Sequence, residues 1–252
     1  MLNPFSDTNW NSISLLESKN IEALIADGYT TVKIPLYVSE IVRSLLNETT
    51  LFFSRSPEAK RKFSCEGRLG YDISNYSPKE SSELMTIERF NYRCGDLRKE
   101  LTAKENNFSS ATAMMLTAIE GLDEFMAATT EQIGRELDKR ITGINLVERI
   151  IEARAINTVR LLRYRSNGIE SAKDHYDNNF LTFIFADNAQ ALRYGDTLEH
   201  EYRMNYGEVL VFLGTQALKV YSAFKRQFHG VRFTKEKNVI RCSIVGFAQI
   251  II

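Results

Sequence analysis

Residues 173–180 read KDHYDNNF, and the apolar run LTFIF follows at 181–185. Alternate side chains of a β-strand share one face, so His175 and Asp177 point the same way if this stretch is extended. The plainer interpretation is a polar turn ahead of a strand. The choice depends on whether the rest of the chain supplies partners for an imidazole and a carboxylate.

One such partner is His229, which lies in the strand-like run QFHGVRF at 227–233. Two histidines and a carboxylate bind one face of an ion and leave the other face open, as in mononuclear non-haem Fe(II) oxygenases. A closed zinc site needs a fourth protein ligand, and the nearby sequence has no thiolate for it. We therefore predict that His175, Asp177 and His229 are metal ligands.

A second pair of residues follows in Arg241-Cys242-Ser243. On a strand, Arg241 and Ser243 share a face, and a guanidinium fork beside a hydroxyl suits a buried carboxylate. An oxoacid that chelates iron at one end would find its anchor here.

Composition excludes several functional classes. The 252 residues are 44% hydrophobic and 25% charged, which is ordinary for a globular protein. Lys+Arg and Asp+Glu are both 32, and no basic block favours a nucleic-acid partner. Apolar runs fall short of the roughly 20 residues of a membrane span. The N-terminal MLNPFSDTNWNS lacks the features of a secretory signal, so we expect a cytoplasmic protein without a membrane partner.

The order of elements predicts helices first and a sheet second. Residues 64–107 contain glycines and many polar residues and are expected to form loops with short elements. Ser109 and Ser110 suit the start of a long amphipathic helix that ends near Leu137. From about Ala155, short β-rich runs separated by turn formers, including one at 219–222, indicate an all-β barrel or a double-sheet roll.

The order His-x-Asp, distant His and Arg-x-Ser resembles the Fe(II)- and 2-oxoglutarate-dependent dioxygenases, in particular the isopenicillin N synthase-like branch. The resemblance extends to Gly28-Tyr29 and Phe52-Phe53 in the first half. It implies an α+β protein with a double-stranded β-helix (jelly-roll) core and flanking helices from the N-terminal half. Residues 1–108 would form a mostly helical region packed on the core. Residues 109–252 would form the long helix and the oxygenase core, and both regions would make one compact unit.

The same resemblance implies an oxidoreductase that uses Fe(II), 2-oxoglutarate and O₂, with ascorbate as a candidate reductant. It would hydroxylate, desaturate or cyclise a small organic substrate with release of succinate and CO₂, as a monomer or homodimer. Cosubstrate binding is assigned to Arg241, Ser243 and Tyr164. Candidate substrate contacts are Phe183, by strand parity with Asp177, and, by position alone, Arg163, Tyr71 and Arg89.

Two departures from the family pattern keep alternatives open. Relatives often carry Arg-x-Asn-x-Tyr before the metal strand, whereas residues 160–164 read RLLRY, so Leu162 replaces the asparagine. This keeps a 2-oxoglutarate-independent Fe(II) oxidase of the isopenicillin N synthase type as an alternative, with a catalytically silent binding protein as a third. The sequence also ends at Ile252, soon after Arg-x-Ser, so a more open mouth or closure by a partner subunit is expected.

Overall fold

The computed structural model describes residues 16–65, 69–76, 85–93, 109–165, 174–233 and 240–252. Its helices are α1 (Ser18–Asp27), α2 (Leu36–Ser54), α3 (Pro57–Arg61), α5 (Ser110–Arg140), α6 (Leu146–Ala153), the short 3-10 helix η3 (Arg154–Ile156) and α7 (Thr215–Val220). Its strands are β1 (Tyr29–Lys33), β2 (Gly70–Tyr76), β3 (Met85–Arg93), β4 (Thr158–Arg165), β5 (Leu181–Asp187), β6 (Leu192–Tyr194), β7 (His200–Glu201), β8 (Glu208–Leu213), β9 (His229–Val231) and β10 (Ile240–Ala248).

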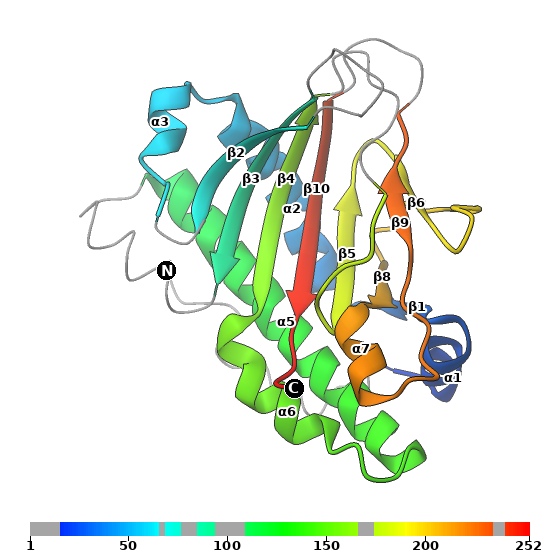
Figure 1. The fold of residues 1–252 in the computed structure, drawn as a ribbon. Helices are drawn as coiled ribbons and strands as arrows, with labels where there is room; N and C mark the ends of the chain where they lie inside the picture. The colour runs from blue at the N-terminus through cyan, green and yellow to red at the C-terminus, as the bar shows by residue number, and fades with distance from the viewer. Residues whose placement is uncertain (1–15, 66–68, 77–84, 94–108, 166–173, 234–239) are drawn as a thin grey trace.

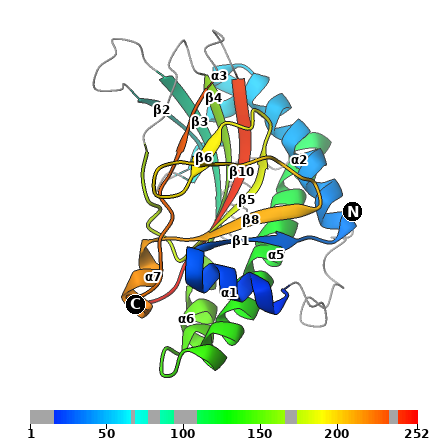
Figure 2. The same cartoon turned by 90° about the vertical axis from the view of Figure 1, so that its right-hand side faces the viewer.

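The strands form two antiparallel sheets. The larger sheet has seven strands in the order β1-β8-β5-β10-β4-β3-β2, and the smaller has three in the order β7-β6-β9. Strand β10 therefore lies between β5 and β4, where Ser243 is opposite both Asp187 and Leu162. Figures 1 and 2 show the large sheet from two sides, with β6 and β9 near β5.

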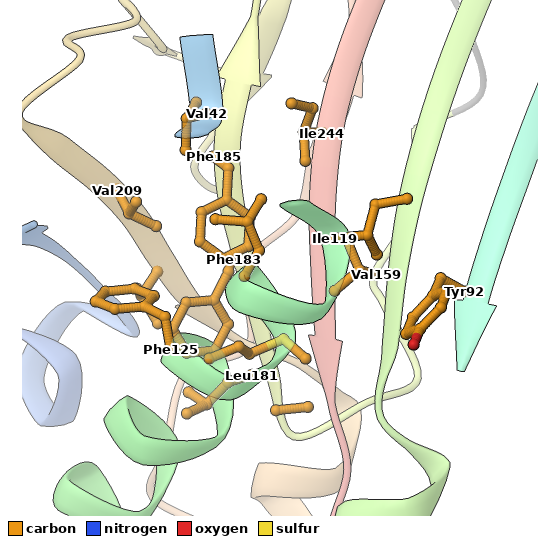
Figure 3. Close-up of a cluster of buried hydrophobic side chains, with 14 of the residues drawn as sticks. Val42, Tyr92, Ile119, Phe125, Val159, Leu181, Phe183, Phe185, Val209 and Ile244 are labelled. Carbon is orange, nitrogen blue, oxygen red and sulfur yellow. The ribbon is translucent and has the colours of Figure 1, made fainter. Parts of the chain in front are cut away.

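Helices α2 and α5 cover one face of the large sheet, and the small sheet lies against the other (Figure 1). The larger cluster of buried side chains fills the space between helices and sheet. Figure 3 shows part of it, where Ile119 and Phe125 of α5 lie among Phe183 and Phe185 of β5. A second cluster, which includes Ile184, Leu192, Phe212, Val231 and Val245, lies between the two sheets. The segment that carries His175 and Asp177 therefore precedes a strand whose sheet is packed on both faces.

Local sequence explains the elements that support this arrangement. The hydroxyl of Ser109 accepts a hydrogen bond from the backbone N–H of Thr112 and caps α5, as predicted from the sequence. Strand β5 is buried at every position because helices cover one of its faces and the small sheet the other. None of the helices in the described ranges offers the long apolar stretch that a bilayer crossing requires.

The predicted fold class, an α+β protein with a jelly-roll core and flanking helices, is confirmed. Two local predictions were wrong. Residues 70–76 and 85–93, expected to be mostly loop, form β2 and β3 and extend the large sheet. The strand expected at 219–222 is replaced by α7, which begins after Gly214. Its short apolar pattern is compatible with either structure, and tertiary packing decides between them.

Candidate metal centre and anion-binding cavity

Backbone pairing brings the two histidines of the predicted triad together. The N–H of His175 donates to the carbonyl of His229 at 2.9 Å, and the reverse bond is 3.0 Å. Their rings lie 4.4 Å apart between centroids. Asp177, two residues after His175, lies with one carboxylate oxygen 3.5 Å from His175 Nε2 and the other 3.5 Å from His229 Nε2. One ligand atom from each of the three residues lies within 4.8 Å of the others.

Neighbouring groups hold the triad in orientation. Thr182 donates its hydroxyl proton to Asp177 Oδ2 at 2.7 Å, and His229 Nδ1 lies 3.3 Å from the carbonyl of Gln227, so its Nε2 faces the centre. Just before His175, Asp174 accepts two hydrogen bonds of 2.6 Å from Arg232, which follows β9. These contacts fix both chain segments that carry the candidate ligands.

Burial and charge favour the ligating protonation states of His229 and Asp177. Burial lowers the pKa of His229 below its ordinary value and favours the neutral imidazole that a metal requires. Burial alone would raise the pKa of Asp177, but the hydrogen bond from His175, the electrostatic interaction with His229 and the hydrogen bond from the Thr182 hydroxyl lower it. The site therefore presents a carboxylate and a neutral imidazole on one face, with the half-exposed His175 beside them.

A second polar group lies at the β4, β5 and β10 strand ends. The guanidinium of Arg241 donates through Nε to Asp187 Oδ1 at 3.0 Å and lies 4.9 Å from the centre of the Tyr164 ring. Asp187 is fully buried and also accepts from the backbone N–H groups of three residues, Ala189, Ala191 and Leu192. The Ser243 hydroxyl is buried and has no hydrogen-bond partner within the described part of the chain.

One cavity of about 500 Å³ connects the two groups. His175, Asp177 and His229 line it together with Arg241 and Tyr164. Two imidazoles and one carboxylate fit an iron ion that keeps an open face. A guanidinium in the wall and an unpaired buried hydroxyl behind it fit the carboxylate of a dicarboxylate bound at that ion. The residues present therefore fit both Fe(II) and 2-oxoglutarate.

The candidate substrate contacts divide between two faces of the sheet. Arg89 lines the cavity, where it forms an ion pair of 3.4 Å with Asp72. Arg163 and Tyr71 do not line the cavity, because both side chains face the helices and contact the buried carboxylate of Glu88.

Phe183 is also on the helix side, stacked on Phe185 and fully buried. We expected Phe183 in the cavity because alternate side chains of one strand share a face. The chain bends at 178–180, so this alternation of faces does not continue from Asp177 into β5. Thr182 takes the cavity position instead.

Sequence reasoning missed Thr182 and Asp187, although both had a signal. Thr182 lies within the apolar run of β5 and Asp187 ends the strand, so both are polar residues in a stretch that should be wholly buried, and a buried polar residue needs a partner. Leu162, the departure from the family pattern, lines the cavity and is the Cα partner of Ser243. Because leucine has only methyl groups where the family has an amide, Leu162 cannot form a hydrogen bond with the Ser243 hydroxyl.

No family model matches the sequence, and no curated protein does. Solved structures do match. A full-length protein of Neurospora crassa in complex with alpha-KG has 16% sequence identity and a TM-score of 0.69, covering 92% of this chain and 78% of that chain. The Arabidopsis thaliana dioxygenase for auxin oxidation AtDAO1, with 2-oxoglutarate, has 16% identity and a TM-score of 0.68, covering 93% and 87%. The fold is that of the Fe(II)- and 2-oxoglutarate-dependent oxygenases.

A third match within this oxygenase fold is JOX2 in complex with 2OG, Fe and JA, with 16% identity and a TM-score of 0.66, covering 93% of this chain and 71% of that chain. The resemblance seen in the sequence is thereby confirmed at the level of the fold. At these identities the likeness concerns the fold alone, so the activity rests on the residues of the cavity.

Proposed function

We propose that the protein is a non-haem Fe(II)- and 2-oxoglutarate-dependent oxygenase that oxidises a small organic substrate. One observation carries the proposal: a single cavity is lined both by the three-ligand face of His175, Asp177 and His229 and by the guanidinium of Arg241. Its volume of about 500 Å³ suits small molecules. The similar solved structures printed with alpha-KG, 2-oxoglutarate or 2OG support the choice of cosubstrate.

With both groups bound, the iron and cosubstrate supply the oxidising chemistry: O₂ and 2-oxoglutarate give succinate, CO₂ and an oxidised substrate. The protein's residues do the rest. His175, Asp177 and His229 would hold the metal from one side. Arg241 and Ser243 would bind the far carboxylate of the cosubstrate, and Tyr164 would support the guanidinium through its ring. The oxidation of a C–H bond would need no acid or base from the protein.

One observation favours a second candidate within the same fold. Leu162 lies next to Ser243 where an amide would assist 2-oxoglutarate, so a direct Fe(II) oxidation without this cosubstrate is the alternative. In that case Arg241 and Ser243 would bind a carboxylate of the substrate itself. Succinate formation separates the two reactions. The expectations of a cytoplasmic monomer or homodimer remain predictions.

The deciding experiment measures succinate from protein loaded with Fe(II), 2-oxoglutarate and O₂ over a panel of small substrates. Asp177→Ala is the blank, because it removes one ligand and leaves the cavity. We expect succinate release coupled to substrate oxidation in the wild type and none in the variant. Equal succinate release by Asp177→Ala would refute the iron assignment, and substrate oxidation without succinate would establish the alternative.

The anchor is tested separately by equilibrium binding under anaerobic conditions. Arg241→Met should weaken 2-oxoglutarate binding by about 10-fold to 100-fold, since a charge-assisted bidentate contact is lost. Its affinity for Fe(II) alone should stay within about twofold, because Arg241 is not a candidate ligand. A variant that binds 2-oxoglutarate as well as the wild type would remove Arg241 from the cosubstrate site.

A further inference from the structure

A third arginine lines the cavity away from the anchor at Arg241. Arg160 is on β4, where its Cα partners are Val245 of β10 and Asn91 of β3. Val245 is four residues along β10 from Arg241, about 13 Å at the rise of a β-strand. Because this distance separates their backbones, Arg160 does not belong to the anchor that the far carboxylate of 2-oxoglutarate would use.

Two neighbours fix the direction of the Arg160 side chain. Its Nε donates to Asn91 Oδ1 at 2.6 Å, and its guanidinium carbon lies 4.7 Å from the centre of the Phe247 ring. The nitrogen that contacts Asn91 leaves the two terminal nitrogens of the fork for another group. Asn91 is itself buried, so the residue that fixes the direction of Arg160 belongs to the protein interior.

The charge of Arg160 lacks the partner that the neighbouring arginines have. Arg241 pairs with Asp187, Arg163 with Glu88 and Arg89 with Asp72, whereas no carboxylate of the described residues forms an ion pair with Arg160. Burial, and then the charge of Arg89, lower the pKa of Arg160, although the charges of Asp177 and Asp72 act in the opposite direction. A partly buried guanidinium in a cavity wall is stabilised when an anion enters.

The sheet order places the backbone of Arg160 two strands away from the residue that orients Asp177. Thr182, which orients Asp177, is on β5, and Arg160 is on β4, with β10 between them. Two strand spacings amount to about 10 Å. A small molecule held at Arg160 by one end would therefore extend toward the open face of the three candidate ligands.

We propose that Arg160, oriented by Asn91 and Phe247, binds the carboxylate of the substrate, so that the enzyme acts on a small organic acid. This inference rests on the proposed oxygenase function. It names the substrate class and a specificity-determining residue for it. Arg89, on the same wall, adds positive potential but is already paired with Asp72.

The experiment measures binding to protein loaded anaerobically with Fe(II) and 2-oxoglutarate. The probes are a panel of small aliphatic and aromatic monocarboxylic acids, each beside its primary amide, and binding is followed by titration calorimetry. We expect acids to bind at least tenfold more tightly than their amides. Arg160→Gln should lower the affinity for the acids by at least tenfold and remove the preference over amides. Arg160→Lys, which retains the charge, should keep the preference at reduced affinity.

Arg135→Gln is the matched control, because Arg135 is on the exposed side of α5 and pairs there with Glu131. It should leave the affinity for the acids unchanged. The inference is overturned if no acid in the panel binds, if acids and amides bind alike, or if Arg160→Gln binds the acids as the wild type does.

Binding of 2-oxoglutarate without any substrate separates this inference from the proposed function. If Arg160→Gln loses 2-oxoglutarate affinity as strongly as Arg241→Met does, Arg160 serves the cosubstrate and the inference fails while the oxygenase assignment stands. If the wild type binds neither Fe(II) nor 2-oxoglutarate, the proposed function fails instead, whatever the acids do.

Discussion

Thr182 links the candidate metal centre to the body of the sheet. Its hydroxyl donates to Asp177 and also lies 3.0 Å from the side-chain nitrogen of Asn179, which bonds the backbone of β5. A carboxylate held by such a hydrogen bond has a fixed orientation and keeps its other oxygen available to bind a metal. The affinity of the candidate site for a metal should therefore depend on a residue that is not one of its ligands.

We predict that Thr182→Val weakens Fe(II) binding by about 10-fold to 100-fold, the usual effect of losing a hydrogen bond to a metal ligand. Valine has nearly the same shape, so packing is retained while the donor is lost. An anaerobic Fe(II) titration measures the change, and Thr182→Ser should recover most of the affinity. Equal affinities of Thr182→Val and the wild type would show that Asp177 needs no such support.

Spacing predicted four residues that now line one cavity, His175, Asp177, His229 and Arg241, and a fifth, Ser243, whose buried hydroxyl has no partner among the described residues. Strand parity works for them because each pair is within one extended segment. Asp187 and Arg160 escaped this reasoning because their roles depend on the register between strands distant in sequence. Parity failed for Phe183 because a bend interrupts the segment.

Among the elements, β10 is constrained by neighbours on both edges and both faces. It pairs with β4 and β5 along most of its length, and its register with β5 shifts between Ile244 and Val245. One face carries Arg241 to the cavity, while the other lies against α5. At Gly246 the space toward α5 is so small that a Cβ atom would be 2.5 Å from Met126 Sδ and 3.0 Å from Phe185 Cε2.

Gly246→Ala should therefore destabilise the protein by about 1 to 3 kcal/mol, the usual cost of overpacking a core. Urea unfolding followed by circular dichroism measures the free energy of unfolding. Gly207→Ala is the control, because the nearest atom to its Cβ, Asn205 Oδ1, would be 3.9 Å away. If both variants unfold at the same urea concentration, β10 and α5 are packed more loosely than described.

A buried ion cluster joins β2, β3 and β4 to the helices. Glu88 of β3 contacts Lys60 and Arg163, and it accepts a hydrogen bond of 2.8 Å from the Tyr71 hydroxyl. Lys60 also donates to the carbonyl of Phe53 in α2 at 3.1 Å. The single carboxylate therefore balances cations from two different elements inside the core.

Glu88→Gln should lower the free energy of unfolding by about 3 to 5 kcal/mol, because it leaves two buried cations without their carboxylate. Glu131→Gln, which breaks the more exposed pair with Arg135 on α5, should cost under about 1 kcal/mol. Chemical denaturation of both variants measures the difference. Equal and small effects would mean that water or other groups compensate Lys60 and Arg163.

The sequence predicted elements well where a local signal was strong. The Ser109 cap and the helical apolar spacing identified α5, and the long apolar run identified β5. It failed for β2 and β3, whose polar residues include Glu88 and Arg89. These side chains are paired with charges elsewhere, and such long-range pairing leaves no pattern in the local sequence.

At the scale of the whole molecule, the two expected regions share one sheet and one core. Strands β1, β2 and β3, from residues before 109, lie at both edges of the large sheet, and side chains from both regions form its larger buried cluster. The candidate ligands hold the small sheet and the segment before β5 together. A bound ion should therefore stabilise the folded state as a whole.

Adding Mn²⁺ at about 100 times its dissociation constant should add about 2.7 kcal/mol to the stability. For a chain of this size that corresponds to a rise in Tm of roughly 5 to 10 °C. Scanning calorimetry measures the rise, and a chelator should reverse it. Asp177→Ala should show no such rise. An equal rise in that variant would place the bound ion elsewhere in the molecule.

The division of the cavity between distant parts of the chain has a consequence for how this protein could change. Ser74, Asn75 and Arg89, which line one end, belong to the hairpin of β2 and β3, whereas the candidate ligands and Arg241 all come after residue 170. Exchange of the hairpin, with Glu88 and the charges it balances retained, would alter what the cavity accepts and leave the candidate metal ligands as they are. The residues of β2 and β3 that line the cavity are therefore the ones to vary in laboratory evolution of a new substrate selectivity.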